Sequence, residues 1–332
     1  MKPIIAVTEK EFYKAREVFA AFKDFTCTPA EPDEFFLSEA IRENRAFAAV
    51  VGLEAYRNRL YESLPRGGVI ARFGVGHDGI DKTQSTKNGI LVTNTPGVLD
   101  NSVAEHAVLL MGSFAHNIGR SHYEMKQKLW NPVIGSELYG KALLVIGCGS
   151  IGCKVARIAS AGFSMRVSGY DTASLDAARV KKDFGVCKIH QKLDHALAEA
   201  DFISLHIPCT LATRHFVNRA FLSALKPQCV IINTSRGQVI DEEALYDVLK
   251  AGRIAGAAID VFENEPFIPV SPGKDLRKLE NILMTPHISS STKEACCNMA
   301  LTCLVNIKAA AEKRYGDMAL LNRDVLKSLP GG

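Results

Sequence analysis

The chain has 332 residues, which is more than one hydrophobic core usually serves, so its length predicts two domains. Lys and Arg number 40 against 36 Asp and Glu, and the net charge of +4 is spread along the chain, which argues against a nucleic-acid partner. Hydrophobic residues make up 47% of the sequence, yet no apolar stretch reaches the roughly 20 residues that cross a bilayer. The N-terminal segment also lacks the apolar core of a signal peptide, so we expect a soluble, cytoplasmic protein with no membrane partner.

Nine cysteines are present, an odd number, and none of them forms a CxxC pair. A disulfide framework or a zinc site requires an even, regularly spaced set, so we expect reduced structural thiols and no metal. Cys187, Cys209 and Cys229 lie in apolar runs, which predicts that they are buried. The neighbours of the adjacent pair Cys296 and Cys297 give no support to a redox role.

Short apolar runs rich in β-branched residues alternate with helical patterns along most of the chain. The first predicted strands cover residues 4–7, 46–51, 68–72 and 91–93, with helices over 9–22 and 34–44. A long apolar helix over 102–115 precedes a second series of strands over 142–146, 165–169, 202–205, 230–233, 256–259 and 282–285, and the tail over 293–313 is helical. This alternation predicts an α/β fold with parallel sheets and helices on both faces.

A glycine-rich turn of the form G-x-G-x-x-G occupies residues 147–152, directly after a predicted strand and before a helical segment. In such a turn Gly147 permits the sharp bend, Gly149 lets a pyrophosphate approach the backbone, and Gly152 lets the helix pack closely. Asp171 follows the last glycine by 171 − 152 = 19 residues, the spacing of a carboxylate that accepts the ribose hydroxyls. Because a carboxylate repels a 2′-phosphate, these residues predict NAD as the cofactor and disfavour an NADP-dependent reductase.

Charged side chains follow three later predicted strands, at the end of a sheet where open α/β proteins bind ligands. Arg236, Glu265 and His287 occupy these positions. An arginine suits a carboxylate substrate, and a histidine oriented by a neighbouring acid can move a proton near neutral pH. Together these three side chains predict a site for keto-acid reduction.

The motifs make the chain resemble the NAD-dependent D-isomer-specific 2-hydroxyacid dehydrogenase family over almost its full length. The resemblance is carried by residues 71–81, 93–98, 104–107, 138–141, 147–152, 233–237, 260–266 and 285–288. It implies a Rossmann NAD-binding domain over 102–286, inserted into a flavodoxin-like substrate domain formed by 1–101 and 287–332. Both domains would be doubly wound parallel sheets, and the long helix after Asn101 would contribute to a homodimer.

The resemblance also implies a role for each matching residue. Arg236 would bind the substrate carboxylate, His287 would serve as general acid and base, and Glu265 would keep His287 protonated. Val75 and Gly76 would offer backbone N–H groups to the substrate, and Asp260 would contact the nicotinamide carboxamide. The cofactor-binding residues would be Gly147, Gly149, Ser150, Ile151, Gly152, Asp171, Pro208, Thr234 and Asp260.

Departures from the family pattern reduce the number of possible substrates but do not identify one. Glu265 stands where formate dehydrogenases carry Gln, and residues 288–292 differ from the aromatic segment of D-lactate dehydrogenases. The chain stops at Gly332, short of the regulatory extension of long phosphoglycerate dehydrogenases, and Cys296 stands where relatives often have Arg. Arg72 suits either a phosphorylated or dicarboxylic acid or a surface role.

Glyoxylate or hydroxypyruvate reduction and phosphoglycerate oxidation therefore remain open. A different class of function, NAD(H) sensing as in the C-terminal binding protein corepressors, shares the fold and the three charged residues. The absence of a long disordered extension favours the enzyme.

Overall fold

A computed structural model describes residues 2–329 of the chain. The chain forms two compact units, Met1–Leu99 with Ser290–Gly332 and Asp100–Ser289, so the second unit is inserted into the first. The sequence predicted boundaries at 101/102 and 286/287, two to three residues from those observed. The substrate-binding role expected for the first unit stays a prediction.

The first unit contains a five-stranded parallel sheet in the order β2-β1-β3-β4-β5. Its strands are β1 (Ile4–Thr8), β2 (Thr26–Ala30), β3 (Ala48–Val51), β4 (Val69–Arg72) and β5 (Leu91–Thr93). Its helices are α1 (Glu9–Lys14), α2 (Arg16–Ala21), α3 (Glu34–Asn44), α4 (Arg59–Ser63), α5 (Lys82–Asn88) and α13 (Lys293–Ala311), with short 3-10 turns over Tyr315–Asp317 and Arg323–Ser328.

The second unit contains a seven-stranded parallel sheet in the order β12-β11-β10-β9-β6-β7-β8. Its strands are β6 (Ala142–Ile146), β7 (Arg166–Tyr170), β8 (Val186–His190), β9 (Phe202–Leu205), β10 (Val230–Asn233), β11 (Gly256–Ile259) and β12 (Ile282–Met284). Its helices are α6 (Asp100–Ala115), α7 (Ile118–Lys126), α8 (Ser150–Phe163), α9 (Ala177–Phe184), α10 (Asp194–Glu199), α11 (Arg219–Ser223) and α12 (Glu242–Lys250), with 3-10 turns over Gly237–Val239 and Leu276–Lys278.

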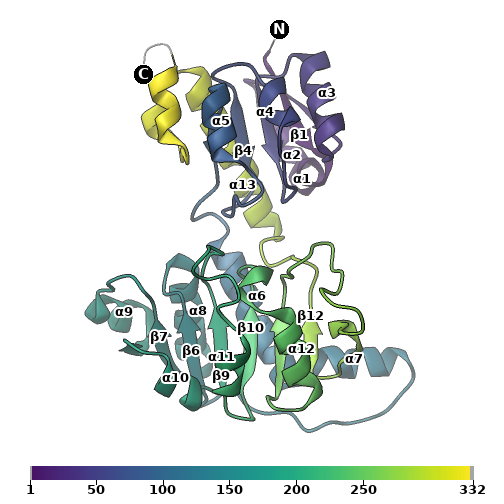
Figure 1. Ribbon diagram of the computed structural model, residues 1–332, viewed down its shortest axis with the longest axis vertical. Coiled ribbons are helices and arrows are strands. Elements are labelled where there is room, and N and C mark those ends of the chain that lie inside the picture. Colours follow the sequence, from purple (N-terminus) through teal and green to yellow (C-terminus); the bar gives the residue numbers. More distant parts are fainter. Residues whose placement is uncertain (1, 330–332) are drawn as a thin grey trace. The chain divides into compact units, whose positions relative to one another are not determined.

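Both strand orders confirm the predicted fold class. The order 2-1-3-4-5 of the first unit is that of flavodoxin-like sheets, and the order of the second is that of a Rossmann sheet with one added strand. In the second unit, helices cover both faces of the sheet (Figure 1), and each face has its own core. One core includes Leu197 of α10, Leu222 of α11 and Leu245 of α12, and the other includes Met111 of α6 and Val155 of α8.

Two local expectations are corrected. The helix predicted over 9–22 is interrupted at Ala15, whose φ of −141° and ψ of 38° lie outside the helical region, so α1 and α2 are separate.

The burial predicted for Cys187 and Cys209 is also corrected, because Cys187 is exposed and Cys209 is only half-buried. Cys187 lies on β8, an edge strand, which explains why its apolar neighbours did not bury it. Cys229 is buried as predicted.

Within residues 2–329, all nine cysteines are free thiols. The same part of the chain has no group of three or more His, Cys, Asp or Glu side chains arranged to hold a metal ion. No helix in it is long and apolar enough to cross a membrane.

Candidate active site

The predicted site residues of the second unit all follow the carboxyl ends of its parallel strands, and so they share one edge of the sheet. The chain adds β7 and β8 on one side of β6 and then returns to add β9 to β12 on the other side. The carboxyl edge between β6 and β9 is therefore the switch point where open α/β sheets bind ligands. The residues are Gly147–Gly152 after β6, Asp171 after β7, Pro208 after β9, Thr234 and Arg236 after β10, Asp260 and Glu265 after β11, and His287 after β12.

The glycine turn has the geometry that a bound pyrophosphate needs. Gly147 has a φ of +92°, and a Cβ there would lie 2.5 Å from the carbonyl oxygen of His206, so glycine is required on both counts. At Gly152 a Cβ would lie 2.0 Å from the Gly147 carbonyl oxygen. A Cβ on Gly149, in contrast, would meet nothing within 4 Å, so the space above the turn is open. Gly149 caps α8 without a side-chain hydrogen bond, which leaves the helix N-terminus available to an anion.

Ser150 and Ile151 begin α8 directly beyond the glycine turn. Ser150 is exposed, and its hydroxyl donates a hydrogen bond to the carboxylate of Asp100 at the start of α6. Ile151 is half-buried and packs against the core shared by α6 and α8. Both residues therefore help to fix the start of α8, where the predicted phosphate site lies.

Asp171 is held at the end of β7 by backbone donors. The Cys148 N–H of the glycine turn donates to its Oδ2 at 2.8 Å, and the Ala173 N–H donates to its Oδ1 at 2.9 Å. A carboxylate oxygen can accept more than one hydrogen bond, so acceptor capacity remains for ribose hydroxyls. The side chain is thus oriented before any ligand binds.

Thr234 places a hydroxyl at this edge that a polar ligand would satisfy. Its side chain is 7% exposed, and its Oγ1 is buried without a hydrogen-bond partner in residues 2–329. Such orphaned groups are rare in folded proteins, and a bound ligand is one way to satisfy them. Pro208 lies exposed after β9, where its carbonyl accepts a hydrogen bond from Thr213 Oγ1 at 2.6 Å. The open glycine turn, Asp171 and Thr234 together fit a dinucleotide.

The turn that carries Arg236 is organised by Asn233, the last residue of β10. The buried Asn233 amide donates to the Arg236 carbonyl at 2.9 Å and accepts the N–H of Ser235 at 3.0 Å. Arg236 is half-buried, and its Nη1 donates to the Ser235 carbonyl at 2.6 Å. These bonds fix the backbone from which the guanidinium projects.

His287 and Glu265 form a short hydrogen-bonded pair. His287 Nδ1 and Glu265 Oε2 are 2.6 Å apart, and their side chains are 21% and 28% exposed. The other Glu265 oxygen, Oε1, accepts the Phe262 N–H at 2.9 Å, which fixes the carboxylate. With Nδ1 occupied, Nε2 is the ring nitrogen left for a substrate.

His287 has a left-handed backbone with a φ of +52°, and the neighbouring carboxylate of Asp260 holds this turn. Asp260 is fully buried and accepts hydrogen bonds from Thr285 Oγ1 at 2.6 Å, the Ile288 N–H at 2.9 Å and the Ser289 N–H at 2.8 Å.

His106 Nε2 of α6 lies 3.6 Å from Asp260 Oδ1 and 3.2 Å from Thr285 Oγ1. Burial acts to raise the pKa of the Asp260 carboxyl, but hydrogen bonds from His106, Thr285 and the two backbone N–H groups lower it below its ordinary value. The contact of Asp260 with nicotinamide stays a prediction, because its carboxylate here orients the His287 turn.

A glycine joins the turn of Arg236 to the loop of Glu265. A Cβ on Gly237 would lie 1.8 Å from the carbonyl carbon of Phe262 and 2.4 Å from the Glu263 nitrogen. Gln238 Nε2 also donates to the Glu263 carbonyl at 2.9 Å. The sequence predicted no role for Gly237, Gln238, His106 or Thr285, although Gly237, His106 and Thr285 lie in motifs that carry the family resemblance.

Val75 and Gly76, the predicted substrate contacts, lie in the first unit after β4 and are half-buried. Asn94 Nδ2 donates to the Val75 carbonyl at 2.8 Å and so fixes this turn. Arg72, the last residue of β4, is 7% exposed. This burial argues against the surface role and leaves the other interpretation of Arg72, contact with a phosphorylated or dicarboxylic acid, as a prediction.

Comparison with known proteins shows the family of the chain. Residues 108–289 match the sequence model of the D-isomer specific 2-hydroxyacid dehydrogenase NAD-binding domain. The chain belongs to this family. It is similar to the glyoxylate reductase of Korarchaeum cryptofilum, with 37% identity over 100% of the chain and 99% of the relative. It is also 42% identical to the hydroxypyruvate reductase of Thermotoga maritima, over 68% of the chain and 72% of the relative.

Solved structures agree with the family assignment. The NADPH-dependent glyoxylate/hydroxypyruvate reductase of Sinorhizobium meliloti superposes with a TM-score of 0.79 at 29% identity, covering 93% of this chain and 94% of that one. The protein is therefore an oxidoreductase, an NAD-dependent 2-hydroxyacid dehydrogenase with a Rossmann NAD-binding unit. The roles of its individual site residues stay predictions.

Proposed function

We propose that the protein reduces a small 2-keto acid to the corresponding D-2-hydroxy acid with NADH. The observation that carries the proposal is the 2.6 Å contact between His287 and Glu265, at the same sheet edge as Arg236 and the glycine turn. An acid–base pair, an arginine and a dinucleotide site are the parts that such a reduction needs.

In the proposed reaction Arg236 binds the substrate carboxylate and orients the keto group. His287 donates the proton on Nε2 to the carbonyl oxygen while the carbonyl carbon accepts a hydride. Glu265 stabilises the imidazolium before transfer, and in the reverse direction His287 takes the proton back from the hydroxyl. Bound NADH supplies the hydride, and the protein supplies position and charge.

The cofactor would be held by the N-terminus of α8 and by the residues that follow the strands. Backbone N–H groups of the glycine turn, Ser150 and Ile151 would bind the diphosphate, and Asp171 would bind the ribose hydroxyls. Thr234, Pro208 and Asp260 would line the nicotinamide side. The orphaned Thr234 hydroxyl supports this arrangement.

Glyoxylate and hydroxypyruvate are the substrates we propose. Relatives named glyoxylate reductase and hydroxypyruvate reductase support this choice, and a 37% identical D-3-phosphoglycerate dehydrogenase from Arabidopsis thaliana represents the alternative. The test is NADH oxidation with glyoxylate, hydroxypyruvate, phosphohydroxypyruvate and pyruvate. We expect the first two to give the highest kcat/KM. If the protein binds NADH but oxidises it with none of the four acids, the result would favour a nucleotide-sensing role instead.

Replacing Asp171 with alanine is expected to weaken the preference for NADH over NADPH by about tenfold or more, since one charge-assisted hydrogen bond is worth roughly 1.5–3 kcal/mol. The change removes the acceptor for the ribose hydroxyls and the charge that repels a 2′-phosphate. The measurement is kcat/KM for both cofactors at a fixed keto-acid concentration. An unchanged ratio would contradict the proposed contact.

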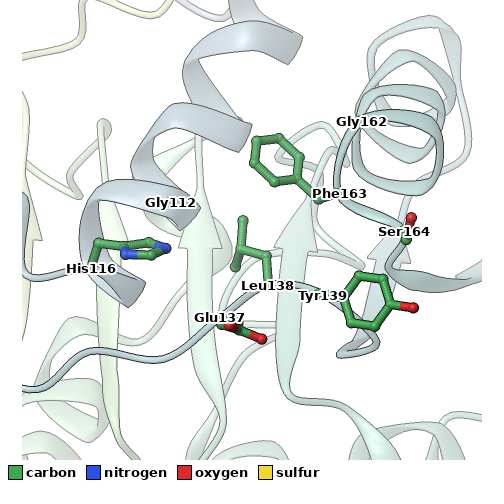
Figure 2. A pocket seen from close by; sticks show the side chains of 8 residues that line it. All are labelled: Gly112, His116, Glu137, Leu138, Tyr139, Gly162, Phe163 and Ser164. Atoms are coloured by element: carbon green, nitrogen blue, oxygen red, sulfur yellow. The ribbon is translucent and has the colours of Figure 1, made fainter.

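We further propose that the protein is a homodimer that uses α6, α7 and the segment after them. Eight of the 18 large exposed hydrophobic residues in the described chain lie between 109 and 139, and this concentration of exposed apolar side chains in one stretch of the chain supports an interface there. They are Leu109, Ile118, Tyr123, Met125, Leu129, Trp130, Ile134 and Tyr139. A cavity of about 460 Å³ is lined by the end of α6, residues 137–139 and the end of α8, and Figure 2 shows Leu138 between His116 and Phe163 in its wall.

Introducing a charge at Ile134, which is 99% exposed, is expected to shift this dimer towards monomer. Sedimentation equilibrium of Ile134→Asp compared with the wild type measures the shift, and Leu211→Asp, at a fully exposed residue outside residues 109–139, is the control. A wild-type protein that sediments as a monomer would contradict the proposed dimer. The cytoplasmic location stays a prediction.

A further inference from the structure

Glu242 is a buried acid that the proposed reaction does not use. It is the first residue of α12, and it is only 3% exposed. Its N–H donates to Glu263 Oε1 at 3.2 Å, and its own Oε1 accepts the Glu263 N–H. This reciprocal pair ties the start of α12 to the loop after β11.

That loop also carries Glu265. The Phe262 N–H donates to Glu265 Oε1 at 2.9 Å, and the next N–H in the chain, that of Glu263, donates to Glu242. Glu265 in turn contacts His287 Nδ1 through its other oxygen. Glu242 and Glu265 therefore accept hydrogen bonds from consecutive peptide groups, and both carboxylates hold the same stretch of the loop.

The charged groups that face Glu242 are Glu263, Glu265 and His215. His215 Nε2 lies 3.0 Å from Glu263 Oε2, and the Arg214 guanidinium lies 3.6 Å from the same oxygen. The pKa of Glu242 is raised to about 7, mainly by burial; repulsion from Glu263 and Glu265 adds to the rise, while the Glu263 N–H and His215 oppose it. Its charge therefore changes near neutral pH.

We propose that Glu242 is a positioning residue that fixes the Glu265 loop and whose negative charge favours the protonated form of His287. It acts through Glu265 and touches neither substrate nor cofactor. A negative charge near an imidazole stabilises the imidazolium, and reduction requires the protonated ring. Ionised Glu242 thus extends keto-acid reduction to higher pH. The inference rests on the proposed role of His287.

The pH dependence of kcat/KM for NADH-dependent hydroxypyruvate reduction tests this role in the wild type and in Glu242→Gln. Glutamine keeps an acceptor for the Glu263 N–H but removes the charge. We expect the alkaline limb of the Glu242→Gln profile to move to lower pH by roughly half a unit, as for loss of one partly screened charge. Glu243→Gln is the matched control, because this exposed neighbour on the same turn contacts Lys274 instead. An alkaline limb that stays at the wild-type pH in Glu242→Gln would overturn the proposal.

Thermal unfolding supplies a second readout that does not depend on turnover. A carboxyl whose pKa is raised in the folded protein binds its proton more tightly there than in the unfolded chain. The wild type therefore loses stability as pH rises from the ordinary range of a glutamate to about 7. We expect the wild-type Tm to fall more between pH 5 and pH 8 than the Tm of Glu242→Gln. Equal pH dependence would mean that folding does not raise the pKa of Glu242, and the change of its charge near neutral pH would then be refuted.

These results separate the inference from the function on which it rests. If His287→Ala keeps full turnover, the proposed proton transfer fails, and the role of Glu242 fails with it. If His287→Ala loses turnover while the Glu242→Gln profile stays in place, only the role of Glu242 fails. Should Glu242→Gln fold poorly, Glu242→Asp keeps the charge, and its alkaline limb is expected within roughly 0.2 pH units of the wild type. If the alkaline limb of Glu242→Asp instead moves by the roughly half pH unit expected for Glu242→Gln, the charge of Glu242 is not what sets the position of the limb.

Discussion

Replacing His287 with alanine is expected to lower kcat/KM for keto-acid reduction by roughly three orders of magnitude, the usual range for loss of a general acid. The ring holds Glu265 through Nδ1 at 2.6 Å, so Nε2 is the proton donor that the reaction loses. NADH should still bind, because the glycine turn and Asp171 follow other strands, β6 and β7. Steady-state kinetics and a fluorescence titration with NADH measure the two effects separately.

His195→Ala is the control for this experiment, since His195 is an exposed histidine on α10 outside the site. It should behave as the wild type in both measurements. Turnover of His287→Ala within about threefold of the wild type would contradict the proposed proton transfer, because loss of a general acid lowers the rate far more. Loss of NADH affinity instead would indicate that the substitution damages the fold of this edge.

Gly237→Ala is expected to produce the second large effect, on stability and on catalysis together. The added Cβ would lie 1.8 Å from the Phe262 carbonyl carbon and 2.0 Å from its oxygen, which are backbone atoms that cannot rotate away. Overpacking of this kind costs about 3 kcal/mol, which lowers Tm by roughly 5–10 °C. Since the two turns that would clash carry Arg236 and Glu265, a backbone shift that relieves the clash is expected to displace these two side chains as well.

Differential scanning calorimetry and kcat/KM for reduction test this expectation. Gly316→Ala is a suitable control, because a Cβ there meets nothing within 4 Å and Gly316 is exposed. If Gly237→Ala unfolds at the wild-type temperature and keeps its activity, the close packing of the two turns is not required for either property.

Much of the fold was predictable because buried parallel strands are continuous apolar runs. The observed first and last residues of β6, β9, β10 and β11 are those predicted from the sequence. β2 and β8 were not predicted, and both lie at the edge of a sheet. Edge strands need less apolar sequence and tolerate proline, as at Pro29 in β2, so their pattern is weak.

The candidate site was predictable only in part, for a similar reason. The glycine turn and the 19-residue spacing to Asp171 are local patterns, and the charged strand ends follow from the rule for ligand sites in open sheets. The residues that support them were not predictable, because their contacts join distant segments. Glu242 and Glu263 are 21 residues apart, and His106 reaches Thr285 across 179 residues. Only the folded chain brings these side chains together.

The central claim is tested most directly by following hydroxypyruvate reduction with both cofactor and product measured. The wild-type protein is incubated with NADH and hydroxypyruvate, NADH loss is followed by absorbance, and the glycerate formed is separated by chiral chromatography. We predict one D-glycerate for each NADH consumed. Formation of L-glycerate, or no NADH consumption by a protein that binds NADH, would contradict the account.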